Sequence, residues 1–310
     1  MGTVYTEEPH NWNEIQPYVR TDRGEFAKEV LAGRKCFFYD TCSFRRHAGI
    51  GETYVKSLLN YMKRQETMVV ITRCVLMELV SQRGILNQEY MDYCRWMEAF
   101  GIPVFLIYEE DIFSVMEICY GTNARMNSLL SWAVRMLKSP ASTITRVLEE
   151  DRSLRDEVIG GKNADRGGLY RDFFAKVRGN KEPQDNLGEE LLAVCLYILS
   201  QLPGEADGKF SIITDDKGAA RRIDELFRRT NRGFGGSRII LFSTPKLVQI
   251  LYEEGFIRDE CAIRAWLRAG TVGNISVLGT RVYDLRSNEI SLGCQELAGL
   301  IVERGIHITF

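Results

Sequence analysis

Short apolar runs along the chain alternate with longer segments in which apolar residues recur at helical spacing. The short runs are rich in β-branched and aromatic residues and are bounded by polar residues or glycine, as is typical of buried strands. They predict strands at 35–40, 67–72, 102–108, 209–214 and 237–243. The periodic segments predict helices at 25–33, 54–65, 73–84, 88–101, 109–121, 185–202, 217–231 and 245–255. This alternation indicates an α/β fold with a mainly parallel central sheet.

The alternation is interrupted between residues 121 and 184. No strand-like run occurs there, and the pattern predicts three helical segments, at 123–138, 140–161 and 168–180. Because the alternation resumes at residue 185, we interpret 121–184 as a helical insertion within one domain that spans 35–256.

Two extensions flank this domain. The N-terminal extension, 1–34, is polar and irregular up to residue 24. The C-terminal extension, 257–310, predicts further α/β structure: a helix at 260–270, a strand-like run at 274–285, a helix at 294–305 and a last strand at 306–310. This tail could form a dimerisation edge or close the sheet.

Composition and charge fit a soluble globular protein. Hydrophobic residues make up 45% of the chain and charged residues 26%, and the formal net charge is −2. A charge so close to zero produces no global basic field, which argues against a general DNA-coating role. It leaves room for an acidic metal site beside a local basic face.

Neither the start of the chain nor its cysteines indicate export or membrane insertion. The first twenty residues lack a positive region followed by an apolar core, and no apolar run is long enough to span a bilayer. The eight cysteines include no C-x-x-C pair, and the chain has only three histidines, which argues against a structural zinc site. Buried, reduced cysteines predict a cytoplasmic protein without a membrane partner.

Carboxylates recur at comparable places in the predicted layout. Asp40 ends the first strand, Glu78 lies about one turn into the helix after the second strand, and Glu189 begins the helix before the fourth strand. Asp215 and Asp216 end the fourth strand. The carboxyl ends of parallel strands gather on one edge of a sheet, so these charges should converge there. They would repel one another unless a cation neutralised them, and hard oxygen ligands suit Mg²⁺ or Mn²⁺.

Each acid also has an ordinary structural role open to it. Asp40 and one of the two adjacent aspartates could cap helices, and Glu189 or its neighbour Glu190 could complement a helix dipole. Glu78 lies in the apolar stretch "VLMELV", where it could be a partly exposed helix charge. The ordered set favours a shared site, because independent capping residues have no reason to select the same edge four times.

The motifs around these acids resemble the PIN-domain nucleases. The segments are "FFYDTCSF", "ITRCVLMELV", "LGEELLAVCLYIL" and "SIITDDKGAARRI", in that order. The resemblance covers roughly residues 35–120 and 185–256, with the helical insertion between them. It implies a PIN-like three-layer α/β/α fold and metal-dependent hydrolysis of phosphodiester bonds, most often in RNA. In this chain Cys42 stands where the family usually has Ser or Asn, so that hydroxyl contact is either lost or taken by Ser43.

The resemblance also implies roles for individual residues. Catalysis and metal binding would fall to Asp40, Glu78, Glu189 and Asp216. The bound Mg²⁺ or Mn²⁺ would lower the pKa of a water molecule and stabilise charge on the scissile phosphate. Asp215 would be a further ligand or would lie just behind the ligands. Hydroxyl hydrogen bonds from Thr41 and Thr214 would orient the carboxylates.

Basic residues follow the first and fourth acids and could hold the phosphate backbone. Together with nearby hydroxyl groups, the candidate substrate-binding residues are Thr41, Ser43, Arg45, Arg46, Thr214, Lys217, Arg221 and Arg222. The basic residues of the 217–231 helix could instead form a solvated face paired partly with neighbouring acids.

Several functions remain open from the residues. A phosphatase or phosphotransferase with Asp40 as nucleophile needs a second acid two positions on, where this chain has Cys42. A response-regulator-like binding domain would not need Glu78 or Glu189. A PIN-like RNA- or protein-binding scaffold with weak activity and a structure-specific DNA nuclease also fit the pattern. We predict a Mg²⁺- or Mn²⁺-dependent endoribonuclease, with RNA favoured over DNA. A homo-oligomer or a protein partner would bind through the insertion or the C-terminal tail.

Overall fold

The central element is a sheet of parallel strands. The computed structural model describes residues 5–80, 83–121, 124–137, 142–161, 163–234 and 236–310, with the backbone alone for 228–234. Within these residues the sheet has the strand order β3-β2-β1-β4-β5. The strands are β1 (Lys35–Tyr39), β2 (Thr67–Thr72), β3 (Val104–Ile107), β4 (Phe210–Ile213) and β5 (Ile240–Phe242). The predicted α/β class with a parallel sheet is confirmed.

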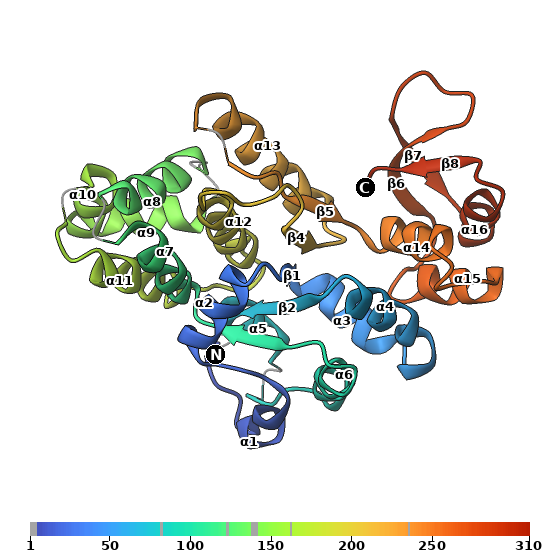
Figure 1. Ribbon diagram of the computed structural model, residues 1–310, viewed down its shortest axis with the longest axis horizontal. Coiled ribbons are helices and arrows are strands. Elements are labelled where there is room, and N and C mark those ends of the chain that lie inside the picture. Colours follow the sequence, from blue (N-terminus) through green and yellow to red (C-terminus); the bar gives the residue numbers. More distant parts are fainter. Residues whose placement is uncertain (1–4, 81–82, 122–123, 138–141, 162, 235) are drawn as a thin grey trace.

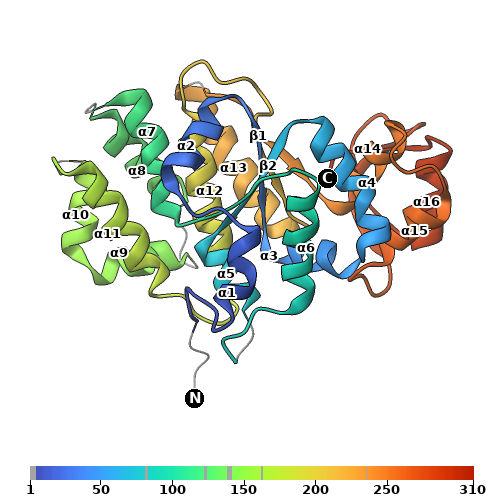
Figure 2. The same cartoon turned by 60° about the horizontal axis from the view of Figure 1, so that its bottom comes forward.

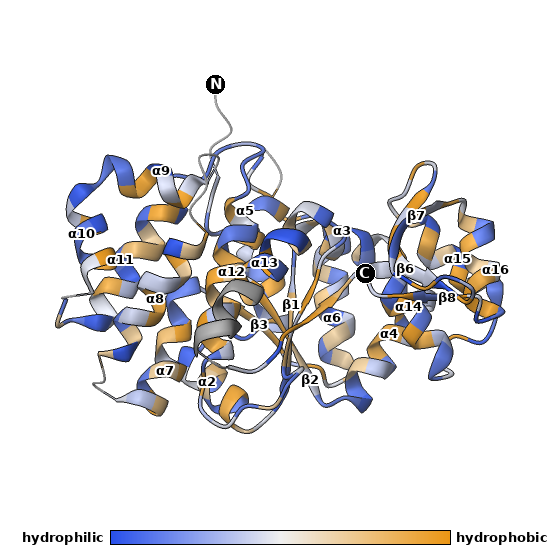
Figure 3. Ribbon diagram, turned by 90° about the horizontal axis from the view of Figure 1, so that it is seen from above, coloured by the Kyte–Doolittle hydropathy of each residue, from blue (hydrophilic) through white to orange (hydrophobic). Residues whose placement is uncertain are grey.

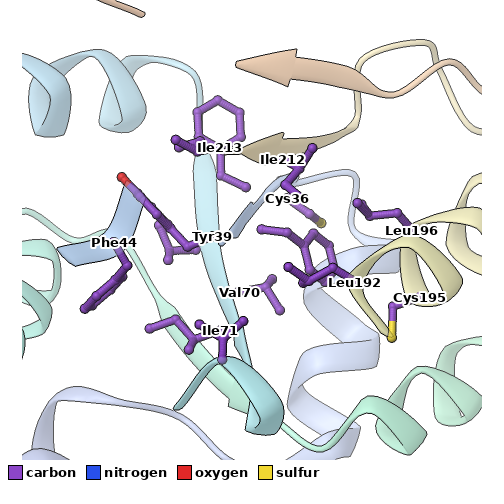
Figure 4. Packing of buried hydrophobic residues seen from close by; sticks show 14 of the residues in the cluster. Cys36, Tyr39, Phe44, Val70, Ile71, Leu192, Cys195, Leu196, Ile212 and Ile213 are labelled. Atoms are coloured by element: carbon purple, nitrogen blue, oxygen red, sulfur yellow. The ribbon is translucent and has the colours of Figure 1, made fainter. Parts of the chain in front are cut away.

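The strands form where the sequence is richest in β-branched and aromatic residues, because these side chains pack well on a sheet covered on both faces. All residues of β2 are buried, and Phe37 in β1 pairs with Val69 on one side and Ser211 on the other. Successive side chains of β1 enter opposite layers. Tyr39 contacts Tyr93 on one face, whereas Cys36 lies toward α12 (Leu187–Ser200) on the other (Figure 4).

Helices cover both faces of the sheet (Figure 2), an arrangement compatible with a three-layer α/β/α fold. One layer contains α3 (Thr41–Gly49), α4 (Glu52–Arg64), α6 (Gln88–Ala99) and α14 (Thr244–Glu253). The other contains α2 (Arg23–Leu31), α7 (Ile112–Tyr120), α12 and α13 (Lys217–Phe234). The ring of Phe26 in α2 meets that of Phe105 in β3 edge to face.

The segment between α7 and α12 is helical, and its helices lie at one end of the molecule (Figure 1). They are α8 (Arg125–Met136), α9 (Thr143–Glu150), α10 (Arg152–Gly160) and α11 (Arg166–Arg178). The sequence pattern predicts one helical segment at 140–161, but α9 and α10 are separate because Asp151 leaves the helical conformation and caps α10. Its Oδ1 accepts a hydrogen bond from Leu154 N. Helices such as α10 and α11 carry hydrophilic and hydrophobic residues in alternation (Figure 3).

The C-terminal residues form a small antiparallel sheet at the opposite end of the molecule (Figure 1). The strand order is β7-β6-β8, with β6 (Ile275–Arg281), β7 (Asn288–Leu292) and β8 (Ile306–Ile308). Two helices flank this sheet, α15 (Glu260–Arg268) and α16 (Cys294–Val302). The predicted run at 274–285 ends earlier, and the chain turns back into β7. The sequence pattern misses that strand because most of its residues are exposed and supply little apolar signal.

The structure differs from the predictions in three other segments. The N-terminal extension contains α1 (Trp12–Ile15) and η1 (Gln16–Tyr18), and η2 (Glu109–Asp111) precedes α7. The helix predicted at 73–84 is α5 (Arg73–Leu79), after which Val80 forms a bridge with Leu86. Residues 81–82 of that prediction lie outside the described residues. Among the described helices, none is long and apolar enough to cross a membrane.

Candidate functional site

Asp40 is the first residue after β1 and the N-cap of α3. Its Oδ1 accepts a hydrogen bond from Thr41 N at 2.7 Å. Its Oδ2 accepts from Thr214 Oγ1 at 2.8 Å and from Cys42 Sγ at 2.9 Å. Burial and the charge of Asp40 raise the pKa of the Cys42 thiol to about 12, so the thiol stays protonated and remains a donor. These three hydrogen bonds stabilise the carboxylate of Asp40, a residue that is only 5% exposed.

Asp216 reaches the same place from β4. It lies at the start of α13, where its Oδ1 accepts from Ala219 N at 3.0 Å, and its own backbone N–H donates to Thr214 Oγ1 at 3.1 Å. Thr214 therefore links the two aspartates, because its hydroxyl donates to Asp40 and accepts from Asp216. Asp216 is exposed, and among the described residues neither aspartate forms an ion pair with a lysine or arginine.

Burial raises the pKa of Asp40 above its usual value. The hydrogen bonds from Cys42, Thr214 and Thr41 act in the opposite direction, and the negative charge of Asp216 raises the pKa further. The ionised carboxylate is thus destabilised by desolvation and by a like charge. A divalent cation beside Asp40 and Asp216 would relieve both effects.

Glu78 lies in the last turn of α5 and is joined to the Asp40 loop by Thr41, whose hydroxyl donates to Glu78 Oε2. Its Oε1 forms an ion pair with Lys181 Nζ at 3.0 Å. The start of α12 passes close by, since a Cβ on Gly188 would lie 2.9 Å from Glu78 Oε1. Glu78 therefore belongs to the same edge as Asp40, but a lysine neutralises its charge.

Glu189 is likewise neutralised. Its Oε2 forms an ion pair with Arg222 of α13. Burial lowers the pKa of Arg222, and the charge of Asp40 acts in the opposite direction. Arg222 Nε is buried without a hydrogen-bond partner among the described residues.

Asp215 differs from Asp216 in every contact. Its Oδ1 accepts from Thr244 N at 2.7 Å, and its Oδ2 accepts from Thr244 Oγ1 at 2.6 Å and Ser43 Oγ at 2.9 Å. Arg46 forms an ion pair with Oδ2 at 3.1 Å. Both oxygens are engaged in holding α3 and α14 at the edge of the sheet. Ser43 thus contacts Asp215, and the Cys42 thiol itself contacts Asp40.

Glu190 lies on the far side of α12 and is buried against the helical segment 121–184. Its Oε2 accepts from Ser142 Oγ and from Ile144 N. Burial raises the pKa of Glu190 to about 6. These contacts give Glu190 a structural role away from the Asp40 edge.

The basic candidates other than Arg222 divide into two groups. Arg45 is exposed and donates to the backbone oxygen of Glu78, and Arg46 contacts Thr271 as well as Asp215. Both arginines line a cavity of about 410 Å³ that also contains Cys42 and Asp215. In the second group, Lys217 pairs with Glu289 at 2.6 Å, and Arg221 lines a separate cavity of about 400 Å³ shared with the C-terminal sheet.

Sequence reasoning missed three buried or half-buried residues behind this edge. Lys181 comes from the segment predicted as an insertion, where only its spacing of four from Asp185 could have drawn attention to it. Thr244 Oγ1 lies 3.0 Å from His47 Nε2, and His47 Nδ1 lies 2.8 Å from Tyr39 Oη. Burial lowers the pKa of His47 to about 4, so this chain of hydrogen bonds below Asp215 is neutral.

The carboxylate oxygens at this edge can be compared with the ligands that a divalent metal ion requires. Within the described part of the chain, no group of three or more His, Cys, Asp or Glu side chains is arranged to hold a metal. Mg²⁺ usually takes one or two carboxylates, keeps several waters and binds substrate phosphates. Asp40 and Asp216 supply two carboxylates without a cation of their own, so their chemistry fits a single hydrated divalent ion.

Comparisons with known proteins add no identity to this geometry. No family model, curated protein or solved structure matches the chain. The function therefore has to follow from the chemistry of the residues themselves.

Proposed function

We propose that the protein is a Mg²⁺- or Mn²⁺-dependent endonuclease with a PIN-like fold that hydrolyses phosphodiester bonds, with RNA favoured over DNA. The observation that carries the proposal is the pair formed by buried Asp40 and exposed Asp216, linked by Thr214 and free of any paired cation among the described residues. The parallel sheet, with both aspartates at its carboxyl edge, supports a ligand site there. The preference for RNA rests on the resemblance of the sequence motifs.

In this proposal each residue has a separate task. Asp40 and Asp216 hold the cation, Thr214 and Cys42 fix the orientation of Asp40, and Arg45 holds a phosphate of the substrate at the adjacent cavity. When bound, the divalent ion lowers the pKa of a water molecule and stabilises charge on the scissile phosphate. Glu78 and Glu189 complete the acidic edge around the aspartates.

Cleavage assays test the proposal. Labelled single-stranded RNA, single-stranded DNA and double-stranded DNA are incubated with Mn²⁺, Mg²⁺ or EDTA. We expect RNA to be cut only with metal, and Asp216→Asn to lose at least about 100-fold in rate because half of the uncompensated carboxylate pair is gone. Asp207→Asn is the control, since Asp207 precedes β4 at the opposite edge of the sheet and is exposed. Equal cleavage by the wild type and Asp216→Asn, or cleavage in EDTA, would contradict the assignment.

One observation favours a different function, that of an RNA- or protein-binding scaffold with weak activity. Glu78 and Glu189 are already neutralised by Lys181 and Arg222, as expected of acids that hold a structure together. A scaffold needs no divalent ion, so an absence of Mn²⁺ binding at millimolar concentration would favour it over the nuclease.

A further inference from the structure

Lys181 follows α11 and reaches into the acidic edge of the sheet. Its side chain is 3% exposed, and its ammonium group contacts Glu78 Oε1 at 3.0 Å, the backbone oxygen of Glu182 at 3.2 Å and Asp185 Oδ1. The ring of Tyr5 lies 5.1 Å from the nitrogen. An ammonium group has three donors and no acceptor, so these three oxygens satisfy it completely.

We propose that the ammonium group of Lys181 occupies a second cation position of the acidic site, so that the site takes one divalent metal ion, at Asp40 and Asp216, rather than two. This inference rests on the proposed nuclease function. It makes Lys181 a positioning residue that sets the number of metal ions.

The arrangement of oxygens supports this division of the site. Glu78 uses one carboxylate oxygen for Lys181 and the other for the Thr41 hydroxyl, while the backbone N–H of Thr41 donates to Asp40. Glu78 and Thr41 therefore connect Lys181 to Asp40 through a chain of hydrogen bonds, while Asp40 and Asp216 themselves form no ion pair with a lysine or arginine among the described residues. A divalent ion at Glu78 would have to displace the ammonium group or lie beside it, where like charges repel.

Lys181 remains charged in this position. Burial by itself would lower its pKa, but the carboxylates of Glu78 and Asp185 outweigh burial and raise the pKa above its usual value.

The preceding helix explains how the lysine is held. Arg178, the last residue of α11, is 2% exposed and forms ion pairs with Glu7, Glu109 and Glu110. This cluster fixes the end of α11 to the segment after β3, three residues before Lys181. The helical segment 121–184 thereby delivers a cation to the site.

Calorimetric titration with Mn²⁺ tests the inference on the full-length chain. We expect one Mn²⁺ per chain for the wild type and for Lys181→Arg, which keeps a positive charge. We expect two for Lys181→Met, because Glu78 and Asp185 then lack a paired cation. Electron paramagnetic resonance provides a second readout, since two neighbouring Mn²⁺ ions give a spin-coupled spectrum and one does not.

The outcomes separate this inference from the proposed function. A wild type that binds two Mn²⁺ at the acidic edge, or a folded Lys181→Met that still binds one, would overturn the role of Lys181 and leave the nuclease proposal standing. A wild type that binds none would overturn the nuclease proposal itself. Far-UV circular dichroism checks the folding of the variants, and a wild-type count of two would overturn the role of Lys181 even if Lys181→Met does not fold.

Discussion

Asp40→Asn is expected to lower kcat/KM for RNA cleavage by at least about 1,000-fold, or about 4 kcal/mol of transition-state stabilisation. Asparagine fits the space and still caps α3, but it removes the buried charge on which the cation depends. The measurement is kcat/KM at saturating Mn²⁺ for the wild type and the variant. Asp22→Asn is a matched control, because Asp22 also caps a helix, α2, through its carboxylate. Activity within about threefold of the wild type would contradict a central role for Asp40.

When no metal is present, the same variant is expected to gain stability relative to the wild type as the pH rises. Burial raises the pKa of Asp40 in the folded chain above its usual 3.8, so the folded state binds the proton more tightly than the unfolded state. The contribution of Asp40 to stability is therefore lost as the pH rises from 3.8 through the raised value. Asparagine has no such loss. Urea unfolding in EDTA should show that the stability of Asp40→Asn relative to the wild type rises with pH, and a relative stability that falls with pH would contradict this sign.

Arg178→Met is expected to lower the free energy of unfolding by about 3–5 kcal/mol. The guanidinium group is buried between Glu7, Glu109 and Glu110, and it lies over the ring of Tyr108 at 4.9 Å. Its removal leaves Glu109, which is fully buried, with an uncompensated charge. Urea unfolding at neutral pH measures the change.

Arg171→Met is the control for this loss. Arg171 lies on the same helix, α11, but is 67% exposed and pairs only with its neighbour Asp172 among the described residues. Its substitution should change the free energy of unfolding by no more than about 0.5 kcal/mol. Similar losses for the two variants would show that the buried cluster does not anchor α11.

Much of the fold follows from local sequence patterns. The strands of the parallel sheet lie within the predicted runs, because buried β-branched and aromatic segments are visible without knowledge of their neighbours. The division between α9 and α10 is not predicted, since it depends on a single aspartate that bonds to the next helix. β7 is not predicted because an exposed strand is stabilised mainly by pairing with β6, which a local pattern does not reveal.

The site was predictable only in outline. Strand ends placed Asp40 and Asp216 at one edge, because parallel strands share their direction. The doublet of Asp215 and Asp216 could not be resolved from sequence, since the difference lies in which helix each carboxylate meets: α14 for Asp215 and α13 for Asp216. The lysine beside Glu78 and the arginine beside Glu189 come from distant segments, so their pairing appears only in three dimensions.

Anomalous diffraction from crystals of the full-length protein soaked in Mn²⁺ would locate a divalent ion bound at the edge of the sheet. We predict a manganese peak between the carboxylates of Asp40 and Asp216, with Lys181 still paired to Glu78. Ordered carboxylates without a peak, or a peak only at other residues, would contradict it.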